Sequence, residues 1–267
     1  MQDPNIVILE ASLPKPQSKP PASETRVKIP NARIFEIEKN FSDSNTDLPH
    51  MMPTPEAFTE EAQKLGINQN SIIVVYDNLG VYSSPRAWWM FRAMGHEQVF
   101  VLDGGLPEWQ KAGMAAESYN AVGDFKKGNF VAHYKPELIK NYRDVLTALR
   151  DNSQVVMDAR SEDRFFGRVP EPREGLRPGH MPNAVNIPFD SIQHDTKMMN
   201  EKELEKIFGS VASPEQQLIF SCGSGVTACV LALGAALAGY KNISVYDGSW
   251  SEWGLPSDLP VVTGDKS

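Results

Sequence analysis

An internal repeat constrains the fold of this chain more than any other feature of the sequence. Residues 72–109 can be aligned with residues 218–253. Each copy begins with an apolar run, continues through a tight loop and a helical stretch to a second apolar run, and ends in Asp-Gly-X-X-X-Glu-Trp. One supersecondary pattern that occurs twice predicts two domains of the same architecture.

Short apolar runs alternate with helical stretches in both copies. The runs are residues 72–76, 98–102, 155–158, 218–221 and 243–246. This alternation is typical of a parallel sheet with helices on both faces. We therefore predict the α/β class, with one domain over residues 1–117 and a second over 137–267. The polar, glycine-containing segment 118–136 is predicted to link them.

Composition limits the kinds of partner. The 267 residues carry a net charge of −8, and 41% of them are apolar. A basic surface for nucleic acid is not expected, because phosphate recognition needs clustered Lys and Arg. No apolar run is long enough to cross a bilayer, and residues 1–15 have no basic region before their short apolar stretch. We expect a cytoplasmic protein that binds neither nucleic acid nor membrane.

The two cysteines have different surroundings. Cys229 falls within an apolar helical run and is predicted to be a core residue. Cys222 follows the run 218–221 and precedes a Gly-Ser-Gly turn at the start of that helix. Without a nearby His pair, the two thiols suggest neither a disulfide framework nor a zinc site, and no metal is expected. Cys222 is therefore predicted to be reactive.

The loop after Cys222 can hold an anion. Its glycines permit a backbone that curls around the cysteine, so successive N–H groups face inward beside the positive end of a helix dipole. Such a setting lowers the pKa of a thiol and favours a thiolate at neutral pH. The expected donors are the backbone amides of Gly223, Ser224, Gly225, Val226 and Thr227.

A thiolate in an anion-binding loop suits either phosphate-ester cleavage or sulfur transfer. Phosphatase loops of the tyrosine type place an Arg six residues after the cysteine, where it binds phosphate through two hydrogen bonds. Ala228 occupies that position here. Sulfur transfer is therefore favoured, and a phosphatase remains a minor alternative.

Four segments, in this order, resemble the 3-mercaptopyruvate sulfurtransferases of the tandem-domain rhodanese superfamily. They are "SSPRAWWMFRAMG" (83–95), "DARSEDRFFGRVPEPREGLRPGHMPNAVNIPF" (158–189), "CGSGVTA" (222–228) and "YDGSWSEWG" (246–254). The resemblance implies two rhodanese-like domains, each with a mainly parallel sheet flanked by helices, and an enzyme without a cofactor. Asp77 aligns with Cys222, so the first domain is expected to be non-catalytic.

The resemblance also implies a mechanism. Cys222 would take sulfane sulfur from 3-mercaptopyruvate as a persulfide and release pyruvate, and a thiol acceptor such as thioredoxin, a small thiol or cyanide would take the sulfur. The loop amides would stabilise the negative charge on sulfur. Arg164 and Arg173 match the family's substrate-binding arginines.

Some members of the family are proposed to use a Ser-His-Asp relay. Ser224 and His50 match its first two positions, and Glu38 stands at the position of the acid. Two alternatives stay open. One is a thiosulfate sulfurtransferase, although such enzymes carry Arg and Lys where Gly223 and Ser224 stand here. The other is a non-enzymatic module that binds sulfur or an anion.

Overall fold

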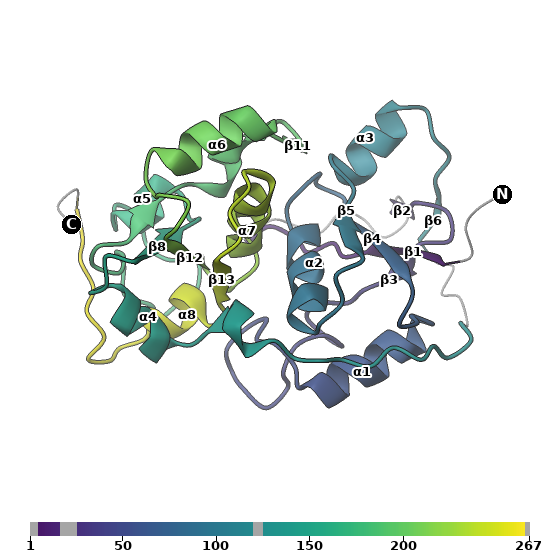
Figure 1. The fold of residues 1–267 in the computed structure, drawn as a ribbon, viewed down its shortest axis with the longest axis horizontal. Coiled ribbons are helices and arrows are strands. Elements are labelled where there is room, and N and C mark those ends of the chain that lie inside the picture. The colour runs from purple at the N-terminus through teal and green to yellow at the C-terminus, as the bar shows by residue number, and fades with distance from the viewer. Residues whose placement is uncertain (1–4, 17–25, 120–124, 265–267) are drawn as a thin grey trace. The chain divides into compact units, whose positions relative to one another are not determined.

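The computed structural model describes residues 5–16, 26–119 and 125–264 (Figure 1). The chain forms two compact units. The first comprises Met1–Ser44, Met52–Lys135 and Asp195–Lys197, and the second comprises Asn45–Met51, Pro136–His194 and Met198–Ser267. The short segment Asn45–Met51 is thus grouped with residues that lie far from it in the sequence.

The first unit contains a parallel four-stranded sheet. Its order is β3-β1-β4-β5, and its strands are β1 (Ile6–Glu10), β3 (Arg33–Ile34), β4 (Ile72–Tyr76) and β5 (Val99–Val101). β1 and β4 are in register over five residue pairs, from Ile6 opposite Ile72 to Glu10 opposite Tyr76. The apolar runs 72–76 and 98–102 therefore form neighbouring parallel strands, as predicted.

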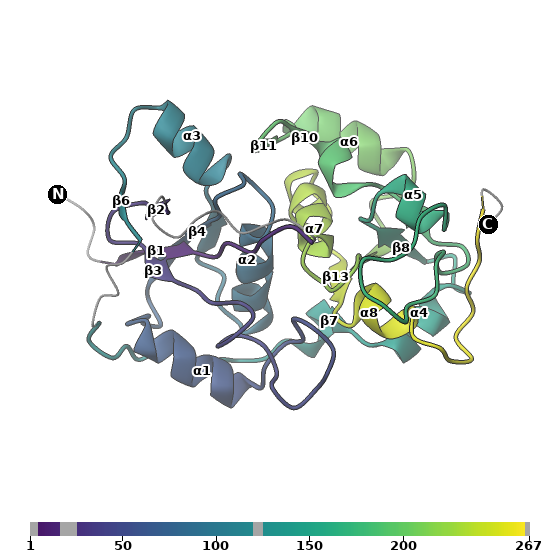
Figure 2. The same ribbon diagram turned by 180° about the vertical axis from the view of Figure 1, so that it is seen from behind.

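Helices pack on the sheet of the first unit through two separate clusters. They are α1 (Pro55–Lys64), α2 (Ser84–Ala93) and α3 (Gly105–Lys111). Phe58 of α1 and Phe91 of α2 pack edge to face within an aromatic cluster that also contains Phe130. Leu106 of α3 belongs to a different cluster, with Tyr76 of β4. The helices α1 and α3 lie on different sides of the sheet (Figures 1 and 2).

The segment predicted to be a linker lies partly outside the described residues, at positions 120–124. Before that gap, β6 (Glu117–Ser118) pairs antiparallel with β2 (Val27–Lys28). After it, the chain follows the first unit, because the Gly128 and His133 amides donate to main-chain carbonyls of α1 and of the end of α2. Phe130 between them is fully buried.

The second unit contains a parallel five-stranded sheet in the order β7-β13-β12-β8-β9. The strands are β7 (Ile139–Lys140), β8 (Gln154–Asp158), β9 (Val185–Asn186), β12 (Gln217–Ser221) and β13 (Ile243–Tyr246). Shorter elements of this unit are the 3-10 helices η2 (Pro136–Leu138) and η3 (Phe189–Ile192). The chain also has the paired strands β10 (Gln193–His194) and β11 (Lys197–Met198), of which Lys197 is grouped with the first unit. The sheet places β12 in the centre.

The second sheet is covered on both faces. Its helices are α4 (Tyr142–Ala148), α5 (Glu162–Phe165), α6 (Glu201–Gly209), α7 (Ala228–Leu237) and α8 (Ser249–Trp253). Adjacent residues of a strand point to opposite faces. On β12, Ile219 packs in the cluster formed with α4 and α8, whereas Phe220 meets Phe208 of α6. None of the helices in the described parts of the chain has the length and apolar character needed to span a membrane.

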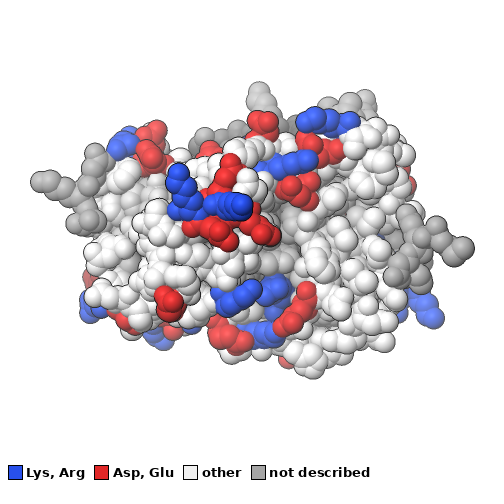
Figure 3. All heavy atoms as spheres, turned by 45° about the horizontal axis from the view of Figure 1, so that its top comes forward, with Lys and Arg blue, Asp and Glu red and all other residues white. Residues whose placement is uncertain are grey.

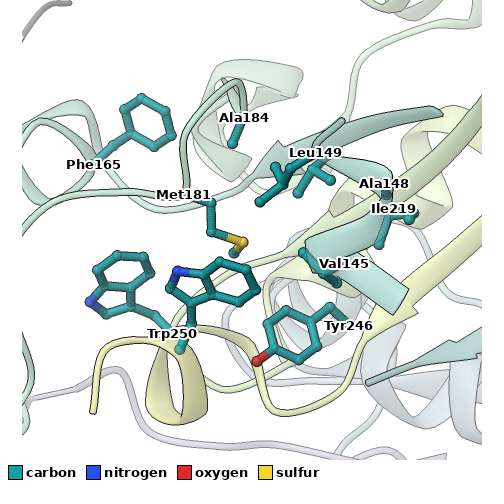
Figure 4. Packing of buried hydrophobic residues seen from close by; sticks show 11 residues of the cluster. Val145, Ala148, Leu149, Phe165, Met181, Ala184, Ile219, Tyr246 and Trp250 are labelled. Carbon is teal, nitrogen blue, oxygen red and sulfur yellow. The ribbon is translucent and has the colours of Figure 1, made fainter. Parts of the chain in front are cut away.

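The core beneath α4 and α8 is built around two tryptophans (Figure 4). Trp250 and Trp253 are fully buried, and each indole N–H donates to a main-chain carbonyl, that of Arg177 or Pro260. Burial of their rings therefore leaves no indole donor unsatisfied. On the opposite face, Cys229 of α7 is also fully buried, as predicted.

The two repeat copies match in individual hydrogen bonds. The amide of Leu106 donates to the carbonyl oxygen of Asp77 at 3.0 Å, and the amide of Trp250 donates to the carbonyl oxygen of Cys222 at 2.9 Å. Each bond ties the start of the helix after the second strand to the first residue of the preceding loop. The alignment of Asp77 with Cys222 therefore holds in three dimensions.

One buried histidine in each unit makes stability depend on pH. Burial lowers the pKa of both His96 and His180, although each ring also bonds to a carbonyl oxygen. Each ring is therefore neutral in the folded chain at a pH at which the unfolded chain binds a proton. We expect stability to fall as the pH drops below ~6.5. Urea unfolding at pH 7.5 and 5.5 checks this, and His96→Gln with His180→Gln should reduce the difference. A larger difference in that variant would contradict the assignment.

Candidate active site

Cys222 occupies the carboxyl end of the central strand of the second sheet. It follows Ser221, which pairs in parallel with Asp158 at the end of β8. From β8 the chain continues to β9 on one side, whereas from β12 it continues to β13 on the other. Ligands of open α/β sheets bind at the carboxyl ends of strands where the order reverses in this way. Cys222 is therefore placed at the expected ligand position of this sheet.

Helix α8 holds the main chain of the cysteine loop. Besides the bond from Trp250 to Cys222, the Ser251 amide and hydroxyl both donate to the Gly223 carbonyl oxygen, at 2.9 and 2.6 Å. The carbonyl groups of Cys222 and Gly223 are thus directed toward the start of α8. This arrangement fixes the orientation of the first peptide units of the loop.

Ser249 is a residue of the site that the sequence analysis missed. Its Oγ accepts hydrogen bonds from the amides of Cys222 and Gly225, both at 3.1 Å, and donates to the Tyr246 carbonyl at 2.9 Å. Its φ of 49° costs a non-glycine residue about 1 kcal/mol. The aligned position in the first unit is Gly105, with φ 52°. The sequence carried a signal for Ser249, because the other copy of the repeat has glycine at the aligned position.

The amides of the cysteine loop are divided between two uses. The Gly225 amide donates to Ser249, as described above. For the amides of Gly223, Ser224, Val226 and Thr227, no acceptor is found among the described residues. Cys222 itself is only 2% exposed. These four amides are therefore available to an anion. Their hydrogen bonds to a charged group would be strong, because little solvent reaches this place.

The loop of the first unit shows how such a loop holds a negative charge. There Oδ2 of Asp77 accepts hydrogen bonds from the amides of Tyr82, Ser83 and Ser84, at 2.9–3.0 Å, and from the Ser84 hydroxyl at 2.7 Å. Oδ1 accepts a further bond from the Leu79 amide. The carboxylate thus fills the curl of its own loop. Cys222 takes the aligned position in the second unit, with open amides instead.

Both arginines predicted to bind substrate lie beside Gly223. A Cβ atom added to Gly223 would stand 3.2 Å from Nη2 of Arg164 and 3.8 Å from Nη1 of Arg173. Nη2 of Arg173 also lies 3.5 Å from Oγ of Ser224. The fold therefore brings two guanidinium groups, from α5 and from the loop after it, to the residues directly after Cys222.

A buried ion-pair network supports Arg164. Both oxygens of Glu171 accept hydrogen bonds from Arg164, at 3.3 and 2.6 Å, and the Glu171 side chain is 1% exposed. Arg160 donates to Glu171 at 2.9 Å and pairs with Asp158 through its Nε and Nη2 atoms. Burial alone would lower the pKa of Arg160, but the two carboxylates raise it above its usual value. The Arg160 guanidinium therefore stays charged in the core.

His50 is brought to the cysteine loop. It belongs to the segment Asn45–Met51 of the second unit, and its Nδ1 lies 3.0 Å from Oγ of Ser224. The tautomer of the ring decides which of the two atoms donates. Its φ of 62° is uncommon for a residue with a side chain. Glu38 belongs to the first unit, where its side chain is exposed, and its role as the acid stays a prediction.

Comparison with known families identifies both units. A family model described as "Rhodanese-like domain" matches residues 4–112 and 142–255. The chain belongs to the rhodanese family. It contains two rhodanese-like domains with mostly parallel sheets, so the fold class predicted from the repeat is confirmed.

Similar proteins cover nearly the whole tandem rhodanese chain. The "3-mercaptopyruvate sulfurtransferase" of Escherichia coli is 42% identical over 98% of this chain and 93% of its own length. The human protein of the same name is 40% identical over 84% of this chain and 76% of its own length. The crystal structure of SseA from Escherichia coli has a TM-score of 0.82, with 94% of each chain covered.

Charges on one face of the molecule are mixed in sign. On the face drawn in Figure 3, Lys and Arg side chains are interspersed with Asp and Glu side chains rather than gathered into a basic patch. In the parts of the chain that are described, no group of three or more His, Cys, Asp or Glu side chains is placed to hold a metal ion. The positive charges next to the cysteine loop are the guanidinium groups of Arg164 and Arg173 beside Gly223.

Proposed function

We propose that this chain is a 3-mercaptopyruvate sulfurtransferase with Cys222 as its nucleophile. The observation that carries the proposal is the convergence of Arg164, Arg173 and His50 on Gly223 and Ser224, the two residues after the cysteine. Together with the open loop amides, these groups offer cations for a carboxylate, a polar contact for a carbonyl oxygen and donors for an anionic sulfur.

The first half-reaction loads sulfur onto the enzyme. The thiolate of Cys222 attacks the sulfur of 3-mercaptopyruvate, a new S–S bond forms and the carbon–sulfur bond breaks. The electron pair of that bond leaves as the enolate of pyruvate, which takes up a proton. The four loop amides without an internal acceptor stabilise the negative charge that develops on the two sulfur atoms.

Arginine and serine side chains orient the donor in this mechanism. Arg164 and Arg173 bind its carboxylate, because guanidinium groups present paired N–H donors that match two oxygens. Ser224, in contact with His50, donates a hydrogen bond to the donor's carbonyl oxygen and so favours the enolate. We propose Glu38 as the acid that orients His50.

The second half-reaction restores the thiolate. A thiol or cyanide attacks the outer sulfur of the persulfide, the S–S bond breaks, and the acceptor leaves with the sulfur. Thioredoxin and small thiols are the acceptors that we propose. We also propose a cytoplasmic location, from the absence of a long apolar run in the sequence. One similar protein, from Arabidopsis thaliana, is named as mitochondrial.

A comparison of donors tests the proposed reaction. The purified chain should convert cyanide to thiocyanate with 3-mercaptopyruvate and release equimolar pyruvate, with kcat/KM at least about tenfold above that for thiosulfate. Intact mass after exposure to the donor should show one added sulfur atom. A higher kcat/KM with thiosulfate would assign the chain to the thiosulfate sulfurtransferases. No added sulfur with either donor would indicate a binding module instead.

A further inference from the structure

The charges beside Gly223 are not balanced evenly. Two carboxylates, of Asp158 and Glu171, pair with two guanidinium groups, of Arg160 and Arg164. Arg173 has no ion pair with any described residue, and its guanidinium group donates a hydrogen bond to Ser224. Within the second unit, the two guanidinium groups at the loop therefore carry one uncompensated positive charge, because Glu171 neutralises Arg164.

From this balance we infer that Glu171 is a positioning residue that sets the donor's charge class. Glu171 holds Arg164 beside Gly223 and balances its charge, so the groups next to the cysteine match a donor with a single carboxylate. This inference rests on the proposed function and gives a physical reason for a preference for 3-mercaptopyruvate over thiosulfate. A dianion such as thiosulfate would find only one free positive charge, and its second charge would be desolvated without compensation.

The burial of Glu171 explains why its charge has a strong effect on Arg164. Its side chain is 1% exposed, whereas that of Arg164 is 20% exposed and directed to the loop. Glu171 is held from behind by Arg160, which is completely buried and lies over the ring of Trp250. A carboxylate fixed in this way is screened little by solvent, so its charge acts strongly on Arg164 and on an anion beside it.

The test substitution is Glu171→Gln, which removes the charge and keeps the shape. Arg160 would remain paired with Asp158, and Arg164 is partly exposed, so the variant leaves no buried charge without a partner. We expect the ratio of kcat/KM for thiosulfate to that for 3-mercaptopyruvate to rise at least about tenfold, mainly through KM. Both donors are assayed in the same buffer at pH 8.

Three further variants separate charge from structure. Glu174→Gln makes the same change at an exposed acid three residues away, and the ratio should stay within about twofold of wild type. Glu171→Asp keeps the charge at a shorter reach, so KM should rise for both donors while the ratio is unchanged. In Glu171→Gln with Arg164→Gln the charge balance is restored, and the ratio should return toward wild type. If Glu171→Gln does not fold, a tenfold change of the ratio in Glu171→Asp would overturn the inference.

Anion binding gives a readout that does not depend on turnover. By calorimetry, Glu171→Gln should bind sulfate at least about tenfold more tightly than wild type does, with a smaller gain for pyruvate. Equal changes for the two anions, or none, would overturn the role of Glu171. A wild-type chain that transfers sulfur from neither donor would instead refute the proposed function, and the comparison of sulfate with pyruvate would still decide the role of Glu171.

Discussion

The Cys222→Ser variant is expected to lose sulfur transfer by about three orders of magnitude or more. A serine hydroxyl is not ionised at neutral pH, and it cannot hold sulfane sulfur as a persulfide. The amides of Gly223, Ser224, Val226 and Thr227 would still be present, but no anionic sulfur would face them. Thiocyanate production measures the loss, and intact mass after donor exposure should show no added sulfur.

Cys229→Ser is the matched control for this experiment. Cys229 is the other cysteine of the chain, is fully buried, and has its Sγ 3.2 Å from the Gly225 carbonyl oxygen. A serine hydroxyl can keep that contact, so the variant should fold and still gain one sulfur atom from the donor. If the Cys229→Ser chain gained no sulfur while the Cys222→Ser chain did, the nucleophile would be Cys229 and not Cys222.

The strands and the place of Cys222 could be predicted because they depend on local pattern. Apolar runs such as 218–221 and 243–246 are buried on both faces, so their composition alone marks them as interior strands of a sheet. A glycine-rich turn after such a run marks the carboxyl edge of the sheet. The repeat adds the correspondence between the two loops, because the alignment of its copies places Asp77 opposite Cys222.

The supporting residues could not be predicted in the same way because they depend on tertiary contacts. Glu171 reads as an ordinary acid in a polar loop, yet its side chain is buried between Arg160 and Arg164. Ser249 reads as a small residue after glycine, yet it bonds two amides of the cysteine loop. Whether a charged side chain is buried depends on the positions of its counterions in three dimensions, and the local sequence does not give these positions.

His50 illustrates the contribution of a family resemblance. Nothing in the local pattern around residues 45–51 marks them as part of the second unit, since 174 positions separate His50 from Ser224. The resemblance named His50, and the structure brings its ring to Ser224. Its action on the donor stays a prediction, as does that of Glu38.

Arg160→Met is expected to have the largest effect on stability. It would leave Asp158 and Glu171, whose side chains are 0% and 1% exposed, without the guanidinium group that joins them. Removing one partner from a buried ion pair typically costs about 3–5 kcal/mol, because the remaining charge is desolvated without compensation. For a domain of this size the melting temperature should fall by roughly 10 °C. Urea and thermal unfolding measure the change.

Arg168→Met provides the comparison at a solvated ion pair nearby. The side chains of Arg168 and Asp163 are 45% and 62% exposed, and their charged atoms are 3.5 Å apart. A pair of this kind contributes about 0.5 kcal/mol or less, so the same substitution should barely change the unfolding midpoint. Similar losses for Arg160→Met and Arg168→Met would contradict the buried network. A loss confined to Arg160→Met would show that the cost arises in the buried network, and not from replacing any arginine of this region by methionine.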